Sequence, residues 1–164
     1  MIAQHDPGTI MQTATSFWAS KVLLTAIELD LFSVLDEESM TAAQLGDLLG
    51  LHPRGTFDFF DALVAMNFLD REGDGQEGKY KNTPASRAFL DKKSPAYIGG
   101  FPEMLNSRLF GFWNDLGTAL KTGKAQSEIK HNGKPVFEEL YSDGDRLGEF
   151  LEAMSSIQTA NFEA

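Results

Sequence analysis

Thr41-Ala-Ala-Gln-Leu-Gly-Asp-Leu-Leu-Gly50, followed directly by Leu51-His52-Pro53, is the stretch of sequence that decides the fold. Thr41 and Gln44 have the spacing of a capping box, in which the hydroxyl and the amide each accept from a backbone N–H of the first turn. Gly50 stands where a helix ends. Pro53 can open the next helix because its missing N–H would have had no partner there. The stretch therefore predicts a helix, a tight turn and a second helix.

The residues after this turn complete a small unit. The second helix is expected over about residues 54–67, with Phe57, Phe60 and Leu63 on its buried face. Two short segments, 68–71 and 79–83, then flank a turn-rich loop and predict a β-hairpin. A helix, a tight turn, a helix and a hairpin make a winged helix-turn-helix. We therefore expect a mostly α fold: a winged helix-turn-helix with a small β-hairpin plus additional long helices.

Long helices are predicted on both sides of this unit. From Thr9 to about Leu35 the pattern is helical, with a break near Asp30, and apolar residues line two sides of the helix. A helix of this kind is buried on two sides, so a second chain or a second domain must cover the additional face. Beyond a short helix that starts at Thr83-Pro84, we expect helices over about residues 101–122, 136–141 and 146–164.

Composition narrows the class of protein. The 164 residues are 42% hydrophobic and 23% charged, which is typical of a folded globular domain. The formal net charge is −10, whereas a domain that binds nucleic acid normally presents a basic face. No run approaches the roughly 20 apolar residues of a membrane span, and the amino terminus lacks the basic residues of a signal peptide. The chain has no cysteine, which fits a cytoplasmic protein.

The sequence offers no supported catalytic, cofactor-binding or metal-binding residue. His5, His52 and His131 lie in a tail, a turn and a polar loop, so a metal site has little support. A dinucleotide-type loop needs a strand, closely spaced glycines and a helix amino terminus. The glycines between residues 73 and 78 lie in the predicted hairpin loop, and no strand leads into Gly99-Gly100. No Ser sits in a Gly-x-Ser-x-Gly turn, although a dispersed Ser-His-Asp site stays open.

Several sequence segments resemble one family, the bacterial SAM-dependent small-molecule O-methyltransferases related to the plant caffeic-acid and flavonoid O-methyltransferases. They are Phe17-Trp18-Ala-Ser-Lys21-Val-Leu-Leu-Thr-Ala-Ile27, Thr41-Ala-Ala-Gln-Leu45, Leu51-His-Pro-Arg-Gly55, Phe59-Phe-Asp-Ala-Leu-Val64, Tyr80-Lys-Asn-Thr-Pro84 and the stretch from Gly99 to Trp113. The resemblance implies an intertwined, winged-helix-like dimerisation domain over residues 1–95. It also implies that residues 96–164 form the roof of a substrate pocket and lead to a SAM-binding domain. That domain, with its glycine loop and general base, is missing here, so the chain alone should be inactive.

The resemblance also implies site residues. Met104, Leu109, Phe110 and Trp113 on one helix, with Phe150 and Met154 on another, would face a planar aromatic substrate, which thioether and ring contacts suit. Ordinary core packing is the alternative for each of them. Asn106 is open between orienting a substrate and facing water, and Arg108 is expected to face water. A homodimer interface would contain four residues of the first helix: Phe17, Trp18, Leu23 and Leu24.

Two other functions compete with this interpretation. A winged helix usually reads DNA through its second helix, but here that helix carries Asp58 and Asp61 beside Arg54, without a basic stripe. An independent small-molecule-binding or dimer-adaptor protein is the third hypothesis. Ser155–Ala164 contain no helix stop signal, which predicts that the sequence continues and argues against an independent protein.

Overall fold

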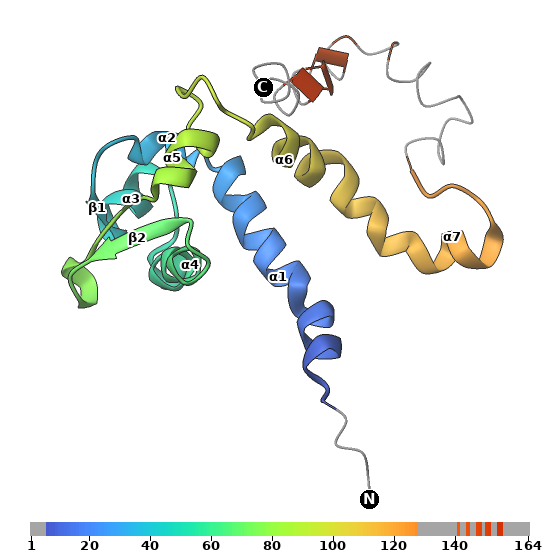
Figure 1. Cartoon of the computed structure of the whole chain (residues 1–164), viewed down its shortest axis with the longest axis horizontal. Coiled ribbons are helices and arrows are strands. Elements are labelled where there is room, and N and C mark those ends of the chain that lie inside the picture. Colours follow the sequence, from blue (N-terminus) through green and yellow to red (C-terminus); the bar gives the residue numbers. More distant parts are fainter. Residues whose placement is uncertain are drawn as a thin grey trace, which may run out of the picture.

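The computed structural model describes residues 6–127 and, nearer the carboxyl end, helical residues 141, 144, 147, 148, 150, 151, 154 and 155. The fold is mostly helical with one small antiparallel sheet. Three parts are visible in Figure 1: helix α1, a body from α2 to α5, and a second helical rod from α6 to α7 that diverges from α1. We call α1 and the α6–α7 rod the two arms.

The body contains α2 (Leu31–Leu35), β1 (Met40–Thr41), α3 (Ala42–Leu48), α4 (Pro53–Ala65), β2 (Leu69–Glu72), the 3₁₀ turn η1 (Gly75–Glu77), β3 (Lys79–Asn82) and α5 (Pro84–Leu90). The predicted capping box is confirmed: the backbone N–H of Gln44 donates to Thr41 Oγ1, and the N–H of Thr41 donates to Gln44 Oε1 at 2.9 Å. The second helix begins at Pro53, with His52 Nδ1 accepting from the N–H of Arg54 at 3.2 Å. It ends two residues earlier than expected, because Asn67 has a left-handed φ of 61°.

The sheet has the strand order β1-β3-β2, and both pairs are antiparallel. Its β2–β3 pair is the predicted hairpin, in register Leu69 to Asn82 and Glu72 to Lys79. Strand β1 was not expected, because two residues carry no periodic signal; it is held by pairing with Tyr80 and Lys79. Asn82 also donates from its amide to the Phe32 and Asp36 carbonyls, which ties the end of the central strand to α2.

A closed core lies between the sheet and the body's helices. Its fully buried side chains come from every layer: Leu31, Phe32, Leu35, Leu45, Phe60, Leu63, Leu69 and Tyr80, joined by Ala26 and Ile27 from the last turns of α1. Phe60 and Tyr80 place their rings 5.4 Å apart across the helix–sheet contact. The body therefore buries most of its own large apolar side chains, although Leu48 and Phe89 stay exposed.

The arms differ from the body. Helix α1 (Gly8–Glu28) ends before Asp30, whose φ of 55° makes the predicted break, and only its last turns enter the core. The second rod consists of α6 (Gly100–Met104), a π-helical segment η2 (Leu105–Leu109), a 3₁₀ segment η3 (Phe110–Asp115) and α7 (Leu116–Thr122). A single regular helix was expected over 101–122, and hydrophobic periodicity cannot reveal an inserted π turn. Within the described residues, no helix is both long and apolar enough to cross a membrane.

Candidate functional site

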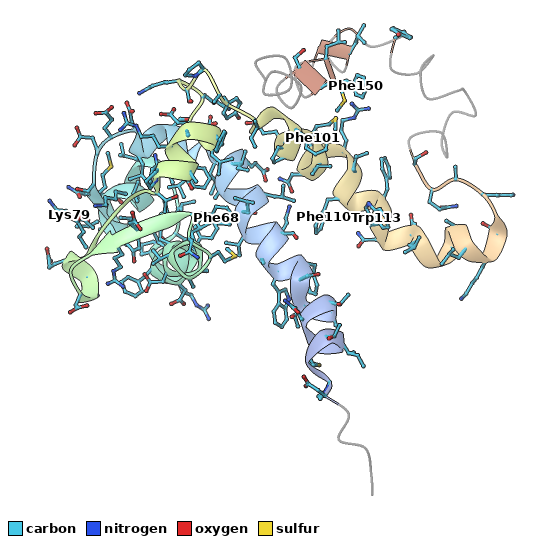
Figure 2. The ribbon with its side chains drawn as sticks, in the orientation of Figure 1. Phe68, Lys79, Phe101, Phe110, Trp113 and Phe150 are labelled. Carbon is cyan, nitrogen blue, oxygen red and sulfur yellow. The ribbon has the colours of Figure 1, made fainter. Side chains whose placement is uncertain are left out.

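The predicted substrate-contacting residues are distributed over both sides of the second arm. Met104 is only 8% exposed and turns inward, whereas Trp113 is 69% exposed. Phe110 is half-buried, with its ring 5.2 Å from the ammonium of Lys21 on α1. Figure 2 shows Phe110 and Trp113 along the rod, and Phe150 on a separate helical stretch. Leu109 is exposed, and Phe150 and Met154 are half-buried.

The predicted interface residues of α1 also divide into two groups. Phe17 and Trp18 are exposed and touch each other edge to face, with ring centroids 5.5 Å apart. Leu23 is half-buried against the core cluster, and Leu24 is almost fully covered by its own chain. An apolar surface around Phe17 and Trp18, extended by Ile10 and Met11 toward the amino end, is therefore uncovered in the single chain.

A cluster of hydrogen bonds fixes where the second arm starts. The Lys92 ammonium binds Asp30, in the break after α1, and Glu103 of α6 at 3.1 Å. Burial lowers the pKa of Lys92, but its bonds to these carboxylates outweigh burial and hold the pKa above its usual value. The Tyr97 hydroxyl also donates to Glu103, and burial, followed by this carboxylate, raises the pKa of Tyr97. One carboxylate thus joins the arm to both sides of the α5–α6 connection.

Gly99 has a packing role in this connection. A Cβ built on Gly99 would lie about 2.4 Å from the Tyr97 ring, so the ring occupies the space that a side chain would need. The hairpin-loop glycines Gly73 and Gly75 adopt positive φ, as a tight turn requires. SAM would need a strand, a glycine loop and a helix amino terminus, and neither group of glycines in the described residues has that setting. These residues do not fit the cofactor.

Sequence analysis left Asn106 undecided and missed its partners. Asn106 lies in the π-helical turn, accepts from Lys21 Nζ through Oδ1, and donates through Nδ2 to Glu28 Oε2 at 2.6 Å. Lys21 and Glu28 are two helical turns apart on α1, so both can reach one amide, but no sequence pattern links them to Asn106. Together they line a hollow of about 460 Å³ between the arms, with Lys92, Gly100, Glu103, Met104 and Ser107.

Helix α4, the helix that would read DNA in a regulator, has Asp61 in contacts with the hairpin, while Arg54 and Asp58 are exposed. Arg71 donates to both oxygens of Asp61 at 3.0 and 3.1 Å, and Tyr80 donates to the same carboxylate at 2.7 Å. The Arg71 guanidinium also lies 4.7 Å from the Phe57 ring. Burial and then the bond to Asp61 raise the pKa of Tyr80. These contacts hold α4 against the hairpin and withdraw both the acid and the cation from a nucleic acid.

Comparison with known proteins identifies the class. The family model of the O-methyltransferase dimerisation domain matches residues 11–92, which is half of the chain. The chain belongs to this family, whose domain is found in SAM-dependent methyltransferases.

Individual relatives agree with this assignment. The tetracenomycin polyketide synthesis 8-O-methyl transferase TcmO of Streptomyces glaucescens is 39% identical over 93% of this chain and 43% of that protein. The N,N-dimethyltransferase OxyT of Streptomyces rimosus is 34% identical over 87% of this chain and 40% of that protein. Human N-acetylserotonin methyltransferase in complex with SAM has the same fold, with a TM-score of 0.85 at 23% identity, over 98% of this chain and 48% of that one. The chain spans less than half the length of these relatives.

Proposed function

We propose that this chain is the dimerisation and acceptor-binding portion of a SAM-dependent methyltransferase that modifies a hydroxyl of an aromatic small molecule. The observation that carries the proposal is the family match over residues 11–92, joined to two arms that leave apolar side chains uncovered. The choice of a hydroxyl follows TcmO, an O-methyl transferase, whereas OxyT methylates nitrogen. The chain alone is expected to be inactive, because SAM would be held by residues outside it.

The first arm supports homodimerisation. Trp18 is 63% exposed, and Phe17, Met11 and Ile10 continue the same uncovered surface along α1. Each large apolar side chain forfeits about 1.5–3 kcal/mol when it stays in water. A second copy that covers this surface recovers that free energy, and a stable interface of this kind buries well over about 1,000 Å².

The second arm supports acceptor binding. Along α6–η3, Met104, Leu109, Phe110 and Trp113 present a thioether, an aliphatic chain and two rings. Phe150 and Met154 add a ring and a thioether from the later helix. Rings pack offset or edge to face with energy beyond burial, which favours a planar aromatic ligand. We therefore assign residues 96–164 to the substrate pocket and 1–95 to dimerisation, with the α3–α4 and hairpin unit acting as a winged helix that does not bind DNA.

Trp113 fluorescence tests the acceptor wall. The chain has two tryptophans, so Trp18→Phe leaves Trp113 as the only indole reporter. Addition of a planar naphthol should quench its emission or shift it to the blue, and Trp113→Phe in the same background gives the blank. Emission that no naphthol or polyphenol changes would contradict the assignment of the wall.

Calorimetry with SAM tests the proposal that residues outside this chain bind SAM. We expect no stoichiometric heat at micromolar SAM, since the described glycines do not form a cofactor loop. Micromolar binding of SAM to this chain would show that the division is wrong.

A further inference from the structure

We propose that Lys21 is a specificity-determining residue that selects an acidic substituent, a carboxylate or an ionised phenol, on the aromatic acceptor. This inference rests on the proposed function, since the second arm supplies the wall for the ring. It concerns the hollow between the arms, which Lys21 lines from α1 while Met104 lines it from α6. Its volume of about 460 Å³ lies within the range of small-molecule sites.

The ammonium of Lys21 is the cation in this hollow that a ligand can still neutralise. The other lysine there, Lys92, already binds two carboxylates, those of Asp30 and Glu103. Within the described residues, Lys21 has no ion pair; its ammonium donates to the neutral amide oxygen of Asn106 and lies over the Phe110 ring. An ammonium has three N–H donors, so two stay available after the bond to Asn106.

Asn106 keeps the Lys21 ammonium free of an ion pair with Glu28. Its amide lies between Lys21 and Glu28, accepting from the ammonium on one side and donating to the carboxylate on the other. The amide therefore prevents a direct Lys21–Glu28 ion pair and takes up the carboxylate that would otherwise neutralise the lysine. The π-helical turn of η2 carries Asn106 to this position, and such turns occur frequently at functional sites.

A planar acceptor with an acidic group can use both features together. Its ring would lie near Met104, which lines the hollow, and near the Phe110 ring beside Lys21, and its anionic oxygen would accept from Lys21. A hydrogen bond between two ionised groups is about twice as strong as one between neutral groups. A neutral isostere of the same shape keeps the ring contacts and loses this bond, so the site should discriminate by charge.

A matched pair of probes tests the inference on the chain that carries Trp18→Phe. We would measure the dissociation constants of 1-hydroxy-2-naphthoate and of its neutral amide, 1-hydroxy-2-naphthamide, from Trp113 fluorescence. The carboxylate should bind about tenfold more tightly, and Lys21→Gln should remove this preference while leaving amide binding within about twofold. Lys79→Gln is the charge-matched control, because Lys79 lies on β3 in the body and should leave the preference intact (Figure 2).

Variants of the residues that neighbour Lys21 provide a second test. Asn106→Ala removes the spacer, so Lys21 should pair with Glu28 and the preference for the carboxylate should fall several-fold. Adding Glu28→Gln to that variant should restore the preference for the carboxylate probe, because Lys21 then has no carboxylate beside it to pair with. A purely structural role of Asn106 would not respond to removal of the Glu28 charge.

The outcomes separate this inference from the proposed function. Equal binding of the two probes, or a preference that survives Lys21→Gln, overturns the role of Lys21 and leaves the aromatic wall supported. If neither probe changes Trp113 emission, both the wall and the role of Lys21 are contradicted.

Discussion

The body and the arms solve the burial of apolar surface in different ways. The body closes a core of its own, in which Phe60, Leu63 and Tyr80 are inaccessible to solvent. The arms enter that core only through the last turns of α1 and leave large side chains such as Trp18, Trp113 and Leu120 exposed. The difference indicates that the body forms the closed core of the fold, whereas the arms leave large apolar side chains uncovered in the single chain.

Polar contacts follow the same division. In the body, Arg71 and Tyr80 both donate to Asp61 and hold a helix against a hairpin. Between the arms, Lys21 is held by a neutral amide and lines an open hollow. A charge that is satisfied internally stabilises a fold, whereas a charge left with unused donors can still bind a ligand.

The largest expected effect tests the self-sufficiency of the body. Phe60→Ala removes a fully buried ring that packs on Tyr80 and should lower the free energy of unfolding by about 3–5 kcal/mol. Trp113→Ala removes a larger ring from the second arm but should change the free energy of unfolding by no more than about 0.5 kcal/mol. Urea unfolding at one protein concentration measures both. Equal losses would show that the arm is as closed as the body.

The next effect concerns what covers the first arm. Trp18→Asp places an unpaired charge on the uncovered surface of α1 and should convert a homodimer to monomer in sedimentation experiments, because aromatic anchors contribute about 2 kcal/mol or more each. Leu48→Asp is the matched control, since Leu48 is equally exposed but lies on α3 in the body. A wild-type monomer at tens of micromolar, or dissociation by both variants alike, would count against the assignment of α1.

Sequence reasoning succeeded where local chemistry decides structure. The capping box at Thr41, the start of α4 at Pro53 and the break at Asp30 are each fixed by a few adjacent residues, and all three are confirmed. Prediction from the sequence failed where a residue far along the chain determines the local structure. Strand β1 exists because β3 pairs with it, and the π turn at Asn106 breaks a period that the sequence otherwise maintains.

The candidate site was less predictable for the same reason. The family resemblance implied that Met104 and Trp113 face the substrate from one helix, but whether a side chain turns inward depends on how α6 lies against α1. The contact between Lys21 and Asn106 joins residues 85 positions apart, and no local pattern encodes it. The assignment of these residues to substrate binding stays a prediction.

A smaller effect concerns the junction of body and arm. Gly99→Ala should displace the Tyr97 ring, break its bond to Glu103 and lower the free energy of unfolding by about 1–3 kcal/mol. Gly117→Ala is the control: nothing lies within 4 Å of its Cβ position in α7, so the better helix former should stabilise the arm slightly. In the background of Tyr97→Ala, the cost of Gly99→Ala should disappear. A cost that persists there would place the strain elsewhere.

The smallest effect is a pH dependence within the body. Burial and Asp61 raise the pKa of Tyr80 above its ordinary value of about 10, so the folded state retains the phenolic proton while the unfolded state loses it. Above about pH 10 the folded state therefore binds more protons, and stability falls as the pH rises. Tyr80→Phe should cost about 1 kcal/mol at pH 8, through the lost hydrogen bond to Asp61. Because the phenylalanine does not titrate, this deficit should shrink as the pH rises from 10 to 11.

Thr41→Ala is the matched control: loss of the cap also costs about 1 kcal/mol, but no ionisable group is involved, so its deficit should stay constant over the same range. Urea titrations at each pH measure the two differences, and a Tyr80→Phe deficit that runs parallel to that of Thr41→Ala would mean that the Tyr80 proton is not held by the fold.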